Sequence, residues 1–175
     1  MELIERETFH VCGYAVETTA ADNDADVSAL YKDFFDTGKE AVLLGLAGSK
    51  KGYYGLSWYT QGHDKYCYLL GIEVGRGIDA PSGALLKDLD KTQFAVARYS
   101  HDKDIMEAWT EFFFTDIPNQ GFAPNAEYNL YFEYYPDDVH GDYELWVPVV
   151  KATTSPIQST IAVNPSGSSG SSESL

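Results

Sequence analysis

The order of the expected elements repeats along the chain, and this repeat constrains the fold more than any other sequence feature. A strand, a helix and a two-strand hairpin are expected within residues 8–75, and the same series is expected within 93–151. Between the copies, Gly77, Pro81 and Gly83 mark residues 75–90 as a loop. The pattern predicts an α+β fold of two fused strand–helix–strand–strand modules. Pseudo-twofold symmetry and a ligand cleft between antiparallel sheets and helices would follow.

Local signals set the expected bounds of these elements. Asp24 or Asp26 is a candidate N-cap for the first helix, and Asp104 has capping-box spacing to Glu107 at the start of the later one. Pro118 and Gly121 are expected to end that later helix. The expected strands cover residues 8–19, 53–60, 65–75, 93–99, 127–135 and 143–151, and the expected helices cover 27–36, 39–47 and the stretch after Asp104.

A direct match between the two copies supports the repeat. Residues 31–35 (YKDFF) align with residues 109–113 (WTEFF) at an offset of 78 residues. In the following strands, YGLSWYT aligns with LYFEYYP, which pairs Ser57 with Glu133. The repeat places residues 1–152 in one domain. The Gly/Ser-rich residues 153–175 are expected to form a flexible C-terminal tail.

The charge balance excludes some partners. The chain has 12 Lys and Arg against 27 Asp and Glu, a net charge of −15. This field disfavours nucleic acid and anionic membranes and favours a cationic ligand, although solubility alone would also explain it. The two cysteines, Cys12 and Cys67, form no metal or redox motif, and no signal peptide or membrane span is seen. A cytoplasmic protein, either monomer or homodimer, is the expectation.

Glu133 is the most informative candidate residue. It lies within the strand sequence YFEYY, where alternation puts it on one face with Tyr131 and Tyr135. A carboxylate among aromatic side chains is costly to desolvate unless a cation or a hydrogen-bond donor meets it. Aromatic faces also attract cations, so the pattern is typical of a receptor for flat organic cations. A solvated Glu133, or one paired with Lys or Arg, is the structural alternative.

Other aromatic residues are candidates with an equally good core-packing explanation. Trp109 lies on the apolar stripe of the later helix, and Trp58 and Trp146 lie in hairpin strands. Tyr54 lies beside Gly55, where a missing side chain permits close approach. The four histidines show no metal-ligand spacing, so no metal site and no cofactor are expected.

Several segments, taken in order, resemble the GyrI-like small-molecule-binding family, whose domain is also the effector-binding half of many AraC-type and MerR-type regulators. They are YYGLSWYT, GIEV before a Gly/Pro loop, DIMEAWTEFF, YFEYY and ELWVPV, and the resemblance covers about residues 3–150. It implies two fused modules around a hydrophobic cleft with a glutamate at its base, here Glu133. It also implies aromatic walls at Tyr54 or Trp58, at Trp109 and at Trp146, with Tyr131 beside Glu133. No helix-turn-helix is expected before the first strand, which favours a standalone form.

Three functions remain open from the sequence. The first is binding or sensing of a small hydrophobic, aromatic or cationic compound, for example in drug or toxin resistance. The second is enzymatic: the resemblance implies hydrolysis of reactive, cyclopropane-type genotoxins, with Glu133 as the catalytic residue. The third is an acidic module for protein interaction.

Overall fold

The computed structural model describes residues 1–60, 62 and 64–153, so the predicted tail lies outside the described residues apart from Thr153. The strands are β1 Glu2–Arg6, β2 Phe9–Thr19, β3 Tyr53–Tyr59, β4 Lys65–Val74, β5 Leu85–Leu89, β6 Thr92–Tyr99, β7 Phe122–Pro124, β8 Tyr131–Tyr135 and β9 Tyr143–Lys151. The helices are α1 Asn23–Asp36, α2 Lys39–Leu44, α3 Ile105–Glu111 and α4 Ile117–Asn119, with a π-helical turn over Phe112–Asp116 between α3 and α4.

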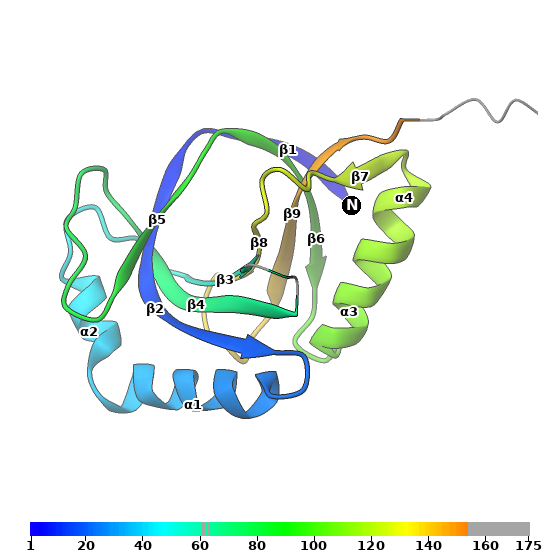
Figure 1. Cartoon of the computed structure of the whole chain (residues 1–175). Coiled ribbons are helices and arrows are strands. Elements are labelled where there is room, and N and C mark those ends of the chain that lie inside the picture. Colours follow the sequence, from blue (N-terminus) through cyan, green and yellow to red (C-terminus); the bar gives the residue numbers. More distant parts are fainter. Residues whose placement is uncertain (61, 63, 154–175) are drawn as a thin grey trace, which may run out of the picture.

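The predicted α+β fold with two modules is confirmed. The strands form one antiparallel sheet in the order β1-β6-β9-β8-β3-β4-β2-β5, and β7 pairs with the end of β9. The first module is β2–α1–β3–β4 and the second is β6–α3–β8–β9. They join where β3 pairs with β8, so the strand order reads the same outwards from this seam. Figure 1 shows the sheet curled, with α1 along one side and α3 along the next.

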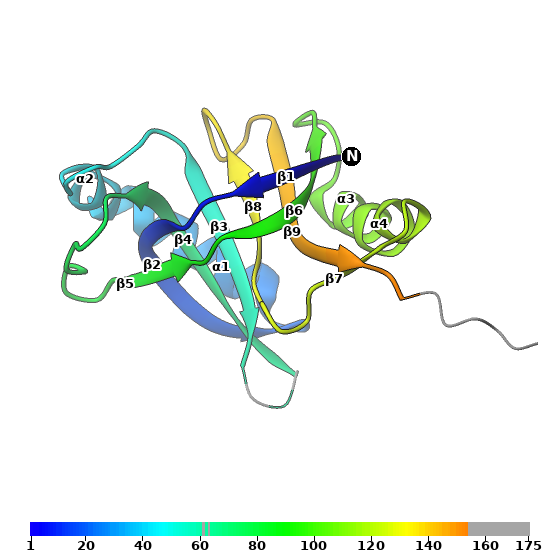
Figure 2. The same cartoon turned by 90° about the horizontal axis from the view of Figure 1, so that it is seen from above.

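The outermost strand of each module comes from the segment of chain that leads into the other module. β1 pairs with β6 and β5 pairs with β2, and Figure 2 shows β1 alongside β6. Both pairings have the same register, from Glu2↔Val96 to Arg6↔Thr92 and from Phe9↔Leu89 to Gly13↔Leu85, with a break at Glu7 and Thr8. The segments β1–β2 and β5–β6 therefore run side by side in a single register, and their two pairings link the modules.

Three apolar clusters fill the molecule. One lies on the concave face of the sheet and includes Phe9, Leu56, Phe94 and Phe132. The other two lie on the opposite face, under α3 and under α1 and α2, and are centred on Phe112 and Phe34 respectively. The two helix-side clusters stay separate, which leaves the seam between α1 and α3 unfilled.

Some local expectations were wrong. β5 lies within the stretch expected to be a loop, and β1 and β7 were not expected. The N-cap of α1 is Asp22, rather than Asp24 or Asp26, and its side chain makes no capping hydrogen bond. Pro118 lies inside α4, which continues directly from the π-helical turn, and the helix ends at Asn119, two residues before Gly121 with its φ of 81°. The capping prediction for Asp104 is confirmed, since its side chain accepts from the Glu107 backbone N–H at 3.0 Å. Within the described residues, no helix is long and apolar enough to cross a membrane.

Candidate functional site

A cleft of about 730 Å³ lies over the β3–β8 seam, between α1 and α3. Both helices, the strands β3, β4 and β8, and the β8–β9 hairpin contribute to its lining. Its volume is within the range of sites for drug-sized ligands, roughly 300–1,000 Å³. The duplicated fold therefore places a ligand-sized cleft where the two modules meet.

Glu133 lies at the base of this cleft. The predicted alternation along β8 is confirmed, because Tyr131, Glu133 and Tyr135 all line the cleft while Phe132 packs into the concave core. Only 8% of the surface of Glu133 is exposed. The carboxyl group is thus withdrawn from water but faces a cavity large enough for a ligand.

Neutral donors hold the Glu133 carboxyl group. The Tyr68 hydroxyl donates a short hydrogen bond to Oε1, and the Trp109 indole N–H donates to Oε2 at 3.3 Å. Tyr31, on α1, meets the Tyr68 hydroxyl at 2.6 Å. One aromatic side chain from each helix is therefore hydrogen-bonded to the glutamate: Trp109 of α3 directly, and Tyr31 of α1 through Tyr68.

Gly55 makes room for this arrangement. It is the residue of β3 that pairs with Glu133 across the seam. A Cβ at Gly55 would lie 2.2 Å from the Tyr68 hydroxyl oxygen and 2.7 Å from Cγ of Glu133. No side chain fits there, so the glycine is what allows Tyr68 and Glu133 to meet.

Burial governs the electrostatics of the site. Desolvation raises the pKa of Glu133, and hydrogen bonding from Tyr68, Trp109 and Tyr135 opposes the rise. Desolvation and the Glu133 charge also raise the pKa of Tyr68 well above its usual value, so its hydroxyl stays protonated. Among the described residues, no Lys or Arg lines the cleft. The carboxyl groups of the described lining therefore face no Lys or Arg within the cleft.

The two helices approach the glutamate symmetrically, while the strands beneath them differ. Tyr31 and Trp109 are the repeat equivalents identified from the sequence, and both line the cleft. Ser57 is the equivalent of Glu133 and also lines the cleft, across the β3–β8 seam. The duplicated cleft therefore has its buried carboxyl group, Glu133, on only one of the two equivalent strands.

Three predicted wall residues lie away from the cleft. Tyr54, Trp58 and Trp146 pack in or against the concave core, on the opposite face of the sheet. Strand alternation explains the correction, because Tyr54 and Trp58 each neighbour a cleft-facing position of β3 in sequence. Glu133, Trp109 and Tyr131 do lie together in the cleft.

The three displaced residues have structural contacts of their own. Tyr54 accepts a hydrogen bond from Arg6 at 3.1 Å and donates to Glu73 at 3.2 Å. Trp146 stacks on Phe132 with ring centroids 5.4 Å apart. The Lys87 ammonium lies 4.0 Å from the ring centroid of Trp58. These contacts account for their burial without a ligand.

Sequence reasoning missed the tyrosines that line the other wall, namely Tyr31, Tyr59, Tyr66 and Tyr68. A signal for Tyr31 was present, since the repeat aligned it with Trp109. Tyr68 lies opposite Ser57 in the β3–β4 pairing, and only the register of that hairpin shows that it points into the cleft.

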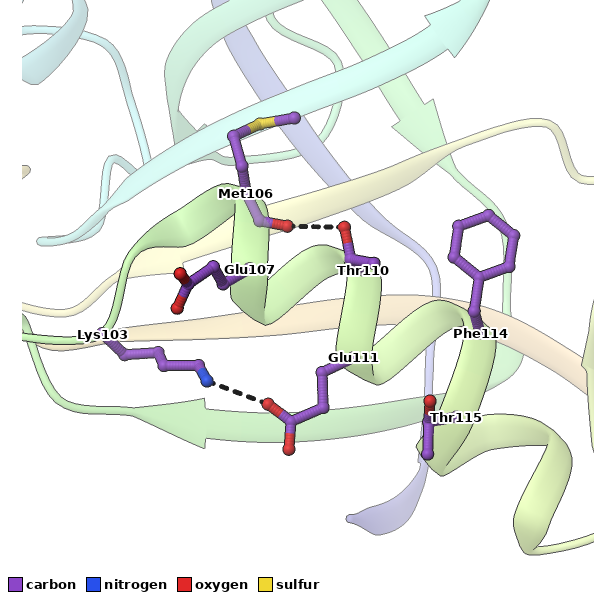
Figure 3. A pocket seen from close by; sticks show the side chains of 7 residues that line it. All are labelled: Lys103, Met106, Glu107, Thr110, Glu111, Phe114 and Thr115. Atoms are coloured by element: carbon purple, nitrogen blue, oxygen red, sulfur yellow. Dashed lines mark hydrogen bonds and ion pairs between the residues drawn. The ribbon is translucent and has the colours of Figure 1, made fainter.

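The outer side of α3 carries a shallower groove of about 470 Å³ (Figure 3). All seven of its lining residues belong to one helical stretch, 103–115, and include an ion pair of 3.0 Å between Lys103 and Glu111. Met106 and Phe114 border both this groove and the cleft. A groove with one wall cannot enclose a ligand, so these exposed apolar residues are better described as the rim of the cleft. No group of three or more His, Cys, Asp or Glu in the described part of the chain is placed to hold a metal ion.

A family model described as "Integron-associated effector binding protein", Cass2, matches residues 2–149. The chain belongs to the Cass2 family. This confirms the GyrI-like resemblance and makes the chain a member of an effector-binding family. A comparison with curated proteins found no match.

Solved structures share the Cass2-type fold at low identity. SAV2435 bound to tetraphenylphosphonium matches with a TM-score of 0.66 and 17% identity, over 85% of this chain and 93% of that one. The integron cassette protein VCH_CASS2 of Vibrio cholerae matches with a TM-score of 0.57 and 16% identity, over 85% and 95%. The C-terminal domain of EcmrR matches with a TM-score of 0.62 and 13% identity, over 86% and 97%.

Proposed function

We propose that this protein binds a hydrophobic aromatic cation in the cleft, with Glu133 as the counter-charge. The observation that carries the proposal is a buried carboxyl group that faces a ligand-sized cavity and receives hydrogen bonds from neutral donors only. An uncompensated buried carboxylate is costly, and a bound cation would recover that cost.

The aromatic walls suit the same ligand class. The Trp109 and Tyr131 rings lie with centroids 5.3 Å apart at the base of the cleft, and Phe113 lies 6.0 Å from Tyr131. Their faces add attraction for a cation, which increases when water is excluded. A flat or multiply aromatic cation would therefore satisfy both the carboxyl group and the apolar walls.

The relatives support the proposal. The Cass2 description is that of an effector-binding protein, and the structure of SAV2435 holds tetraphenylphosphonium, an aromatic cation. EcmrR is seen in a complex with DNA in a further structure, in which its matching region covers 57% of that chain. We infer that the present protein uses the shared fold for capture or sensing of such a compound.

Charge reversal at constant shape tests the proposal. Tetraphenylphosphonium and tetraphenylborate have nearly the same size and opposite charges. The wild type should bind the cation and reject the anion, and Glu133→Gln should weaken cation binding by about tenfold or more. Gln can keep both contacts, with its Oε1 at Trp109 and its amide N–H at the Tyr68 oxygen, so folding should survive. Equal binding of both ions, or an affinity that Glu133→Gln leaves unchanged, would refute the proposal.

Hydrolysis is the second candidate function, and the raised pKa of Glu133 is the observation that favours it. A carboxylate of raised basicity beside the Tyr68 hydroxyl has the groups of a general base and a general acid. Turnover of an electrophilic substrate by the wild type, lost in Glu133→Gln while binding is kept, would support this function. If the wild type binds such a substrate without turning it over, hydrolysis is excluded and the binding function remains.

A further inference from the structure

We propose that the cleft has a second cation subsite at Asp24, so that its preferred ligands are elongated aromatic dications. The inference rests on the proposed function, since it assumes that Glu133 holds one positive centre. Asp24 lies in the first turn of α1 and lines the cleft. It is exposed at the mouth, whereas Glu133 is buried at the base.

Asp24 differs from the two acidic residues beside it. Asp26 accepts a hydrogen bond of 2.8 Å from the Thr18 hydroxyl, and Asp22 interacts with Thr19 outside the cleft. Asp24 makes no ion pair or side-chain hydrogen bond within the described residues. Its charge is therefore free to meet a ligand.

Tyr66 connects the two carboxyl groups along the cleft wall. Its side chain is half-buried and lines the cleft together with Asn23 and Asp24. Burial raises the pKa of Tyr66, and the negative charges of Glu133 and Asp24 both raise it further. Tyr66, Asp24 and Glu133 all line the same cleft, and the charges of both carboxyl groups act on Tyr66.

The β-sheet register gives the length of the aromatic wall that leads away from Glu133 on the strand side of the cleft. Glu133 pairs with Gly55, and Tyr66 pairs with Tyr59, four residues further along β3. At about 3.3 Å per residue, the two ends of this path lie roughly 13 Å apart. Aromatic rings cover the path between them, with centroids of Tyr59 and Tyr66 6.4 Å apart and those of Tyr59 and Tyr131 also 6.4 Å apart. An aromatic body on this path would keep one positive centre at Glu133, and a second charge carried on an arm would be available to Asp24, which lines the same cleft.

Ethidium and propidium are a suitable pair of probes. They share one planar aromatic cation, and propidium carries a second, quaternary ammonium on a short arm. Fluorescence titration would measure both dissociation constants with the wild type, Asp24→Asn, Glu133→Gln and the control Asp22→Asn. The control removes the same charge from the same helix end, at a side chain outside the cleft.

Asp24→Asn should weaken propidium binding by about fivefold and change ethidium binding less than about twofold, because one exposed, partly desolvated charge pair with added cation–π contact is lost. Asp22→Asn should leave both constants unchanged. The propidium effect should shrink in high salt, as expected for a pair at the mouth.

The outcomes separate the two proposals. Suppose that Glu133→Gln weakens the binding of both dyes. If Asp24→Asn then weakens the binding of both dyes equally, or of neither, the second subsite is wrong and the proposed function stands. If neither dye binds, or if both bind with no dependence on Glu133, the proposed function fails and the dication preference fails with it.

Discussion

At the scale of single residues, the site depends on Gly55 as much as on Glu133. Glu133 and Tyr68 occupy the volume that a side chain at position 55 would fill. The carboxyl group is buried because Gly55 lets β3 approach it, and its raised pKa follows from that burial. The chemistry of the cleft thus depends on a backbone position that carries no functional group.

Replacement of Gly55 tests this dependence. Gly55→Ala should lower the free energy of unfolding by about 2 kcal/mol, because the added methyl group overpacks a buried site. It should also weaken tetraphenylphosphonium binding, since Glu133 and Tyr68 must move apart. Gly45→Ala is the control, because its Cβ would lie 3.4 Å from the nearest atom, in ordinary contact. Urea denaturation compares the two variants, and equal stability would contradict the account.

The sequence identified Glu133 and its face of β8, because alternation within one strand is a local rule. It failed for Tyr54, Trp58 and Trp146, although the same rule was available. The repeat aligned Ser57 with Glu133, so Trp58 had to face away from the cleft. Large aromatic side chains suit a core as well as a cleft wall, so their identity does not indicate which face of the sheet they occupy. Tyr68 could not be found in this way, because its position depends on the pairing of two strands.

At the scale of elements, α1 and α3 are equivalents with different ends. The Asp104 side chain caps α3, whereas Asp22 makes no such bond at α1. A π-helical turn follows α3 and adds a residue to one turn, which brings both Phe113 and Phe114 to the cleft. Because α3 has only seven residues, the Asp104 cap at its start is important for the position of Trp109.

The two N-caps give a matched pair of variants. Asp104→Ala should cost about 1 kcal/mol of stability, since a backbone N–H of α3 loses its acceptor. Asp22→Ala should have little effect, because no capping hydrogen bond is lost there. Thermal unfolding measures both, and a larger loss for Asp22→Ala would contradict this view of the two helix ends.

The helices and hairpins were predictable because their signals are local. β5 was not, since its sequence follows a Gly/Pro-rich stretch and it owes its structure to pairing with β2, far away in the chain. β1 likewise depends on β6. Both outer strands pair with segments that are distant in the sequence, so neither is marked as a strand by its own local pattern.

At the scale of the whole molecule, the paired segments β1–β2 and β5–β6 hold the modules in the arrangement that forms the cleft. Arg6 joins this structure, with an ion pair of 2.8 Å to Glu73 on β4 and its guanidinium 3.4 Å from the ring centroid of Phe9. Both charged side chains are mostly buried, at 23% and 13% exposed. Arg6 thus links β1 to the far side of the sheet.

Loss of this link should affect the whole fold. Arg6→Ala should lower stability by about 2 kcal/mol, because Glu73 keeps only the more exposed Lys50 as a cationic partner. Lys91→Ala is the control, since its pairs with Glu5 and Glu7 are exposed and should be worth little. Chemical denaturation should show one cooperative transition in both. A wild-type midpoint for Arg6→Ala would contradict the role given to it.

The central claim is that a cation binds against the Glu133 carboxyl group, and proton release on binding tests it most directly. Burial raises the pKa of Glu133 above its ordinary value in the free protein, and a bound cation would lower it again. Binding of tetraphenylphosphonium should then release a proton at pH values between the bound and free pKa. The affinity should rise with pH through that window and level off above it. Calorimetry in two buffers of different ionisation heat should detect this release in the wild type and not in Glu133→Gln. Release of equal size in both proteins, or an affinity independent of pH across this range, would contradict the claim.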